Sequence, residues 1–154
     1  MALDPKRWTH RTQEAVQASV ELTKTKANPE ITTWHLLSAL IGQADGVVLP
    51  VLQKVGVAPM SLRNKIEDEL DKLPQAYGGE EPKMTRELGR IFDRADGERK
   101  DLTDEYLSTE HLLLAMNQQV GVPTETLRNA IVEVRGSHRV TSQNPEDTLS
   151  LIHI

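Results

Sequence analysis

Cysteine is absent from this chain of 154 residues, and aromatic residues are scarce. Without thiols there can be no disulfide, no thiolate zinc site and no cysteine nucleophile. Aromatic side chains make up only 3% of the sequence, too few for the strands of a typical β-sandwich or barrel. Long apolar runs are also missing, and charged residues interrupt the first ten positions, so we expect no membrane span and no secretory leader. These absences predict a cytoplasmic protein with no membrane partner.

Charge is not concentrated in one sign either. Lysine and arginine total 18 and aspartate and glutamate 23, which gives a formal net charge of −5. No basic block is long enough to neutralise a row of phosphates, so we expect no nucleic-acid partner. No phosphate-binding loop occurs, because Gly78-Gly79 precede two glutamates, and the histidines lack the spacing of a metal site. We therefore expect no catalytic residue, cofactor or metal, and predict that this chain is not an enzyme.

The chain contains an internal repeat. Residues 31–40 (ITTWHLLSAL) resemble 107–116 (LSTEHLLLAM), and residues 55–66 (VGVAPMSLRNKI) resemble 120–131 (VGVPTETLRNAI). Two matches in the same order indicate a tandem duplication. The second copy is 11 residues shorter between its two matching segments, and only the tripeptide 117–119 remains there. We therefore expect it to lack the counterpart of a short helix predicted between Asp45 and Gly56 in the first copy.

Apolar residues recur at helical spacing along the chain, and no convincing alternating strand is present. Proline and glycine at residues 74–83 predict an exposed linker between the copies. Polar residues that favour helix N-caps precede four of the predicted helices: Thr9, Thr32, Thr85 and Ser108. The sequence thus predicts an all-α fold of about seven helices, arranged as two helical repeats with pseudo-twofold symmetry. Repeat one covers residues 9–73 and repeat two residues 84–136.

Two histidines, His35 and His111, occupy the same register of the two copies. They could form a paired ligand site, or each could form hydrogen bonds near the N-terminus of its own helix and fix the entry of the chain. We favour the second interpretation, because buried polar side chains are usually satisfied locally.

The repeated His-Leu-Leu segments, Val-Gly-Val turns and Leu-Arg-Asn triplets resemble the Clp amino-terminal domain, a duplicated helical module that precedes the ATPase rings of AAA+ unfoldases. Residues 104–111 (DEYLSTEH) and the exit 135–147 (RGSHRVTSQNPED) make the resemblance strongest to ClpB-type disaggregases. It covers residues 1–148, with 137–148 as the start of a linker to the ATPase domain. Residues 149–154 (LSLIHI) depart from the family, and we expect a non-native tail there.

This resemblance implies a domain that binds unfolded or aggregated client polypeptides and passes them to downstream ATPase domains of the same chain in a hexamer. Adaptor or co-chaperone proteins are further implied partners. By alignment, Thr9, Asp104 and Glu110 match positions that affect substrate handling in the family. Alternatively, Thr9 could only cap a helix, and Glu110 could only place its negative charge near the positive N-terminal end of a helix.

A shallow apolar client groove is also implied by the resemblance. Its matching positions are Phe92, Arg94 and His111, of which only Phe92 keeps the apolar character of the family. Phe92 could therefore be either a client contact or a core residue.

Three other functions remain as alternatives. An N-domain of a ClpC or ClpA type would dock adaptors for a protease, but ClpC carries glutamate before both histidines, and Trp34 precedes His35 here. We therefore do not expect phosphoarginine recognition. A hydrolase using Glu110 and His111, and a free-standing adaptor without an ATPase, are the other two. The linker-like exit argues against the adaptor.

Overall fold

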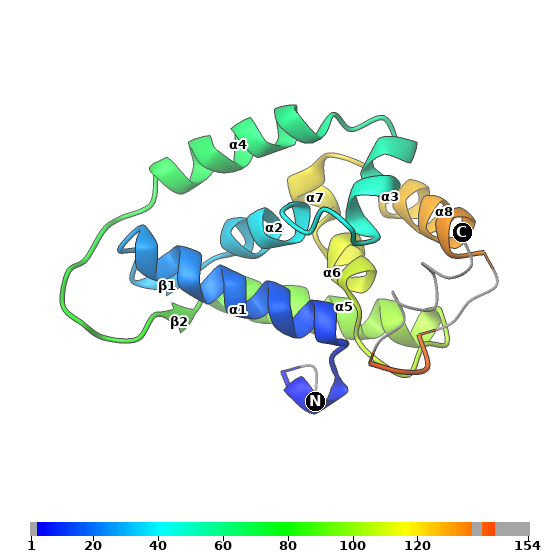
Figure 1. Cartoon of the computed structure of the whole chain (residues 1–154), viewed down its shortest axis with the longest axis horizontal. Helices are drawn as coiled ribbons and strands as arrows, with labels where there is room; N and C mark the ends of the chain where they lie inside the picture. Colours follow the sequence, from blue (N-terminus) through cyan, green and yellow to red (C-terminus); the bar gives the residue numbers. More distant parts are fainter. Residues whose placement is uncertain (1–2, 137–139, 144–154) are drawn as a thin grey trace.

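The computed structural model describes residues 3–136 and 140–143 and consists almost entirely of helices (Figure 1). A short 3₁₀ turn, η1 (Pro5–Arg7), precedes the first repeat. Four α-helices follow: α1 (His10–Thr25), α2 (Thr33–Ile41), α3 (Val48–Lys54) and α4 (Pro59–Asp71). The second repeat contains α5 (Arg86–Asp101), α6 (Thr109–Ala115), α7 (Asn117–Val120) and α8 (Thr124–Arg135). The predicted all-α fold is confirmed.

Helix α7 corrects the expectation of seven helices, because the shortened stretch of the second repeat forms one helical turn. The N–H of Val120 donates to the carbonyl of Met116 at 3.1 Å, and that of Gly121 to Asn117 at 2.8 Å. Four residues are enough to close such a turn. The described residues therefore form eight α-helices, and the counterpart of α3 is reduced to one turn rather than lost.

Helix starts follow the N-cap residues. The Thr9 hydroxyl accepts a hydrogen bond from the N–H of Thr12, and the Thr85 hydroxyl accepts one from Leu88. Pro59 is the first residue of α4, where its fixed φ suits a helix and its missing N–H is not needed. The predicted caps at Thr9 and Thr85 are thus confirmed.

Helices α2 and α6 form the centre of the molecule. Figure 1 shows α6 in the middle, with α1 and α5 along one side and α4 along another. All seven residues of α6 are buried, and six of the nine in α2 are. A helix that is apolar nearly all round is expected in such a position.

The two repeats exchange equivalent contacts. Strand β1 (Glu30–Ile31) pairs in parallel with β2 (Lys83–Met84), so Ile31 faces Met84. An isolated parallel bridge pairs Leu107 with Trp8. Leu107 lies 76 positions after Ile31, and Met84 lies 76 positions after Trp8. The two pairings therefore join equivalent residues, with the roles of the two repeats interchanged, as pseudo-twofold symmetry requires.

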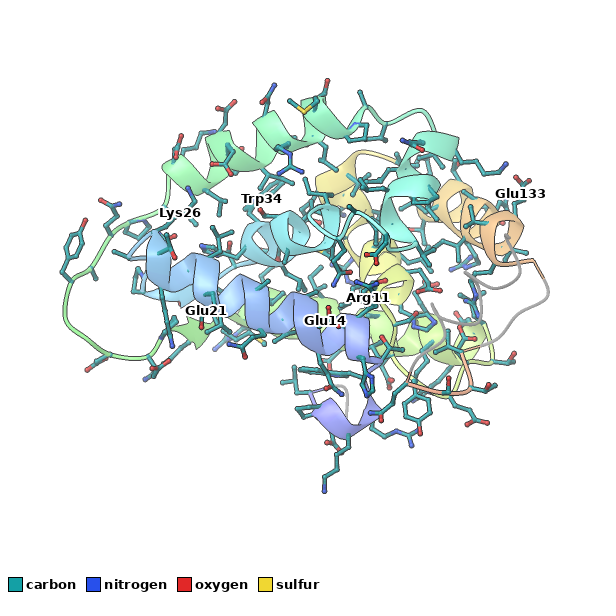
Figure 2. All side chains as sticks on the ribbon, in the orientation of Figure 1. Arg11, Glu14, Glu21, Lys26, Trp34 and Glu133 are labelled. Carbon is teal, nitrogen blue, oxygen red and sulfur yellow. The ribbon has the colours of Figure 1, made fainter. Side chains whose placement is uncertain are left out.

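Two exposed salt bridges join α3 to α8 and the end of α1 to α4. Glu133 on α8 pairs with Lys54 on α3 at 2.8 Å, and Lys26 pairs with Glu67 on α4 at 3.4 Å. Figure 2 labels Glu133 and Lys26, one member of each pair. Such exposed pairs contribute at most about 1 kcal/mol each. The packing of α3 on α8 and of α4 on α2 must therefore come mainly from buried apolar side chains.

The predicted linker runs along the surface between α4 and β2 and forms a wide arc in Figure 1. Nearly all of its side chains are exposed. No helix among residues 3–136 and 140–143 is long and apolar enough to span a bilayer. The exact repeat boundaries stay predictions, and the expected tail at 149–154 lies outside the described residues.

Candidate functional site

His35 and His111 close the N-termini of α2 and α6. The N–H of Thr32 donates to His35 Nδ1 at 2.9 Å, and the N–H of Ser108 donates to His111 Nδ1 at 2.8 Å. Because a backbone N–H can only donate, Nδ1 must accept and the ring proton must lie on Nε2. The predicted local role of both histidines is confirmed. The described part of the chain contains no group of three or more acidic or histidine side chains arranged to hold a metal.

The second ring nitrogen distinguishes the two repeats. His35 Nε2 donates to Asn28 Oδ1 at 2.9 Å, whereas His111 Nε2 donates to Asp104 Oδ2 at 2.6 Å. All four side chains are buried. The same position thus carries a neutral amide in repeat one and a carboxylate in repeat two.

Asp104 receives four hydrogen bonds. Besides His111, its carboxylate accepts from Arg135 Nη1 at 3.0 Å and Nη2 at 2.6 Å, and from the backbone N–H of Val140 at 2.8 Å. Arg135 is the last residue of α8 and is only 5% exposed. A bidentate arginine is a strong partner for a buried carboxylate, since two charge-assisted bonds form at once.

Asp104 and Arg135 stabilise each other in their charged forms. Burial alone would raise the pKa of Asp104, but hydrogen bonds from His111, Arg135 and Val140, with the Arg135 charge, outweigh it and hold that pKa well below its usual range. Burial would lower the pKa of Arg135, yet Asp104 and Glu110 raise it overall. A carboxylate with every acceptor position filled has no capacity for acid–base work, so the arrangement is suited to holding segments together.

Glu110 is the third charged member of the cluster. Its Oε2 lies 3.6 Å from Arg135 Nε, and the side chain is 2% exposed. Its Oε1 has no hydrogen-bond partner among the described residues. We refer to Asp104, Glu110, His111 and Arg135 as the ion-pair network.

Thr9 lies beside the loop that carries Asp104. Its N–H donates to the carbonyl of Leu107 at 3.0 Å, and the Thr12 hydroxyl donates to the same carbonyl at 3.0 Å. The neighbouring Trp8 packs its ring against Phe92, with ring centroids 5.4 Å apart. The start of α1 is therefore joined to both the network loop and the core of α5.

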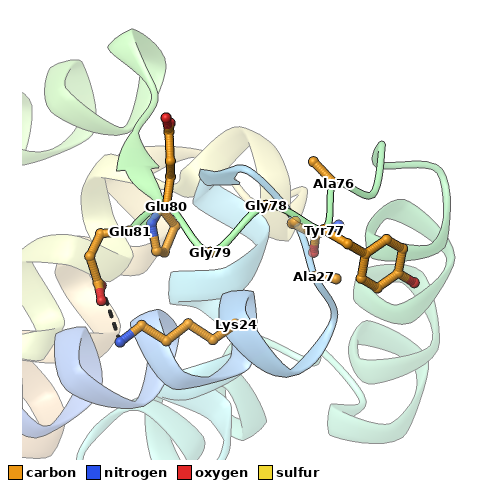
Figure 3. Close-up of a pocket in the computed structure, with 10 residues that line it drawn as sticks. Lys24, Ala27, Ala76, Tyr77, Gly78, Gly79, Glu80 and Glu81 are labelled. Carbon is orange, nitrogen blue, oxygen red and sulfur yellow. Dashed lines mark ion pairs between the residues drawn. The ribbon is translucent and has the colours of Figure 1, made fainter.

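A separate pocket of about 310 Å³ lies between the linker and the end of α1 (Figure 3). Its wall includes Tyr77 and an ion pair between Lys24 and Glu81 at 3.1 Å. Both partners of that pair are well exposed, so it fixes the loop only weakly. The pocket is a consequence of the linker arc, and its one lysine, Lys24, is already paired with Glu81.

Comparison with known proteins decides the family. Residues 7–131, more than half of the chain, match the sequence family described as Clp repeat (R) N-terminal domain. The chain belongs to this family. The duplication, the capping histidines and the exchanged bridges are therefore features of a Clp repeat domain.

Relatives of this Clp repeat domain are chaperones. The chain is 40% identical over 151 residues to the chaperone protein ClpB of Mycobacterium bovis, with 91% of the chain and 18% of the relative covered. It therefore spans about a fifth of the length of the curated relatives it matches. A solved structure with a similar fold is the Hsp104 N-terminal domain of Candida albicans, at TM-score 0.76 and 20% identity, covering 90% of this chain and 98% of that one. Another is the complex of the ClpV N-domain with VipB peptide, at TM-score 0.62 and 16% identity, covering 96% and 87%.

The predicted client residues of the Clp repeat domain all lie in its interior. Thr9 and Phe92 are fully buried, and Asp104 and Glu110 nearly so. Of the predicted groove positions, His111 is also buried and only Arg94 is exposed. Thr9 and Phe92 lie where the start of α1 meets the 104–108 loop and α5, and Asp104 and Glu110 lie at the end of α8. None offers a surface for direct contact, so their role in client handling stays a prediction that must act indirectly.

Sequence reasoning missed Asn28, Arg135 and Val140. A usable signal was present for Asn28, because it precedes His35 by seven residues just as Asp104 precedes His111. Arg135 entered the sequence analysis only as the first residue of the exit that resembles the family. No local pattern connects Val140 with Asp104, because that contact depends on how the chain returns after α8.

Proposed function

We propose that this Clp repeat domain recruits unfolded or aggregated polypeptide for a ClpB-like, ATP-dependent disaggregase and passes it to hexameric ATPase rings formed by the rest of the same protein. The observation that carries the proposal is the 40% identity to ClpB. The solved N-domains of ClpV from Escherichia coli and ClpD from Arabidopsis thaliana share only 21% and 17% with the chain. Nucleotide binding belongs to the downstream domains in this proposal, and the protein acts in the cytoplasm.

The surface favours weak and transient client binding. Large apolar side chains that remain exposed in the described part of the chain are few and lie on different segments: Leu3, Met60, Tyr77 and Val132. Dispersed apolar contacts must offset the ordering of a flexible client, which leaves little net affinity. We expect dissociation constants in the high micromolar range, which suits a domain that hands its client on.

Thr9, Phe92, Asp104 and Glu110 contribute to this function by position in our proposal. Each fixes the place where one element meets another: Thr9 at the start of α1, Phe92 under Trp8, and the two acids at the end of α8. Substitutions there would change how a bound client is passed on, through the arrangement of these elements, and would leave the affinity of the folded domain for an unfolded probe unchanged.

A second candidate function is the docking of a defined adaptor peptide, as in an unfoldase associated with a protease. It is favoured by the similar fold of a ClpV N-domain that was solved with a VipB peptide. Recognition of phosphoarginine is disfavoured in particular, because Glu110 is buried against Arg135 and Trp34 replaces the equivalent acid in repeat one.

Anisotropy of a fluorescent, permanently unfolded protein, such as reduced and carboxymethylated α-lactalbumin, tests the main proposal. We expect saturable binding of the unfolded probe to the purified chain and none of native α-lactalbumin. Equal binding of both, or none up to millimolar chain, would contradict client recruitment. Competition with a ClpV-binding peptide distinguishes the second candidate, which predicts tight displacement by that one sequence only.

A further inference from the structure

The chain that leaves α8 returns to the body of the domain. Residues 140–143, which we call the exit segment, lie against the 104–106 loop. The N–H of Val140 donates to Asp104 Oδ1 at 2.8 Å, and its carbonyl accepts from the N–H of Glu105 at 2.7 Å. The Val140 side chain is 1% exposed. The exit segment is thus packed like a core element at this end.

Its other end binds the start of α1. The carbonyl of Gln143 accepts from the N–H of His10 at 2.8 Å, and the Gln143 side chain donates to the carbonyl of Trp8 at 3.1 Å. His10 is the first residue of α1, so its N–H has no partner within the helix. The exit segment satisfies this donor and connects the start of α1 with the 104–106 loop.

Arg135 and the exit segment share one acceptor. Asp104 Oδ1 receives both Arg135 Nη2, at 2.6 Å, and the N–H of Val140, five residues later. We propose that Arg135 is a positioning residue that, through Asp104, holds the exit segment on the body and so fixes where the chain leaves the domain. Glu110 supports the guanidinium from α6, at 3.6 Å from Arg135 Nε.

Repeat one contains a neutral version of the same contact. There the Asn28 side-chain amide donates to the carbonyl of Pro74 at 2.9 Å, where the chain leaves α4 for the linker. The position that matches Arg135, counted from the aligned Leu-Arg-Asn triplets, is the buried Leu70. Hydrogen bonds between charged groups are roughly twice as strong as neutral ones. The stronger, charged form is found in repeat two, which the exit segment follows.

Holding the exit segment sets the reach of the domain. With the segment bound, the last residue seen held on the body is Gln143, beside α1. With it released, the last held residue is Gly136, seven positions earlier, and seven residues correspond to at most roughly 25 Å of extended chain. This consequence rests on the proposed function, since it concerns delivery of a client to downstream rings. The contact itself does not.

Hydrogen exchange of wild type and two matched variants tests the inference. Val140→Asp places a second carboxylate in the buried site beside Asp104 and should expel the exit segment without touching Arg135. Val132→Asp makes the same change at an exposed position of α8. The readout is the exchange rate of the His10 and Glu105 amides relative to Leu113 in α6, so that any global loss of stability cancels.

In Val140→Asp we expect this relative rate to rise at least about tenfold, and in Val132→Asp to stay at the wild-type value. Wild-type protection of His10 and Glu105 in Val140→Asp, or equal acceleration in Val132→Asp, would overturn the proposal. If Val140→Asp does not fold, Gln143→Ala provides the milder release, with faster exchange expected at His10.

Arg135→Lys tests the positioning role itself, because lysine keeps the charge but cannot form the bidentate contact. We expect the relative exchange of Glu105 to rise, by less than in Val140→Asp, and a wild-type value would show that Arg135 does not position the segment. Binding of the unfolded probe should be unchanged in Val140→Asp. If the wild-type chain does not bind the unfolded probe at all, that result would count against the proposed function alone.

Discussion

Asn28 and Asp104 lie 76 positions apart at the same place in the two repeats, and each accepts a hydrogen bond from the Nε2 of a histidine seven residues later. The distances are 2.9 Å to Asn28 and 2.6 Å to Asp104. In repeat one, burial and the charge of Lys26 lower the pKa of His35 to about 4.

This lowered pKa makes the stability of the domain depend on pH. In the unfolded chain His35 titrates near 6.5, so between pH 6.5 and about 4 the unfolded state binds more protons than the folded state. The stabilisation that the fold gains from a neutral His35 is fully present above pH 6.5, falls as the pH is lowered, and is lost below about pH 4. We expect His35 to account for about 3 kcal/mol of the unfolding free energy lost over this range.

His35→Gln isolates the effect, because glutamine at this helix position can still accept from the N-cap N–H but does not titrate. Urea unfolding at pH 7 and pH 4 should show a loss smaller by about 3 kcal/mol in the variant than in wild type. His10→Gln, at an exposed position, is the control and should behave as wild type. Equal losses in wild type and His35→Gln would show that His35 is not held neutral by the fold.

Phe92 is expected to be structural. Its ring is fully buried against Trp8, so Phe92→Ala should lower the unfolding free energy by roughly 3–5 kcal/mol through lost contacts and a cavity. Arg94→Ala, two residues away and exposed, should change it by less than about 0.5 kcal/mol. The affinity of the folded fraction for the unfolded probe should stay unchanged. A normal melting temperature with lost affinity would instead make Phe92 a client contact.

Local patterns allowed much of this fold to be predicted from the sequence. The caps at Thr9 and Thr85 depend only on a side chain and the backbone three residues later, so the sequence carries the whole signal. The His-Leu-Leu repeat likewise indicated two central helices. Helix α7 was missed because a single turn closed by Gly121 leaves almost no periodicity to detect.

The candidate site was less predictable, since its decisive contacts join distant parts of the chain. Asp104 and Arg135 are 31 positions apart, and Thr9 and Leu107 are 98 apart. Alignment to the family indicated Thr9, Asp104 and Glu110 but not that they are buried. Burial depends on how the two repeats and the exit segment pack, which no residue pattern in one helix encodes.

The linker arc should exchange its amides rapidly. Residues 36–40 and 112–116 lie in the two central helices, whereas 77–81 have no regular structure and are exposed. We expect amides of 77–81 to exchange orders of magnitude faster than those of the central helices. Ala76 should be slower than its neighbours, because its N–H donates to the carbonyl of Ala27 at 2.8 Å. Protection of residues 77–81 comparable to that of the central helices would contradict an exposed, irregular linker.

The two Val-Gly-Val turns should respond equally to substitution. Gly56 and Gly121 both have φ of +82°, a conformation that costs an L-residue about 1–2 kcal/mol, and an added Cβ would meet no atom within 4 Å at either site. Gly56→Ala and Gly121→Ala should therefore each destabilise the domain by that amount, through the backbone alone. Gly97→Ala is the control: it lies exposed within α5 with an equally open Cβ position, so alanine should stabilise by roughly 0.5–1 kcal/mol. Thermal unfolding of the three variants measures the difference, and a neutral Gly121→Ala would mean that the turn after α7 can relax to negative φ.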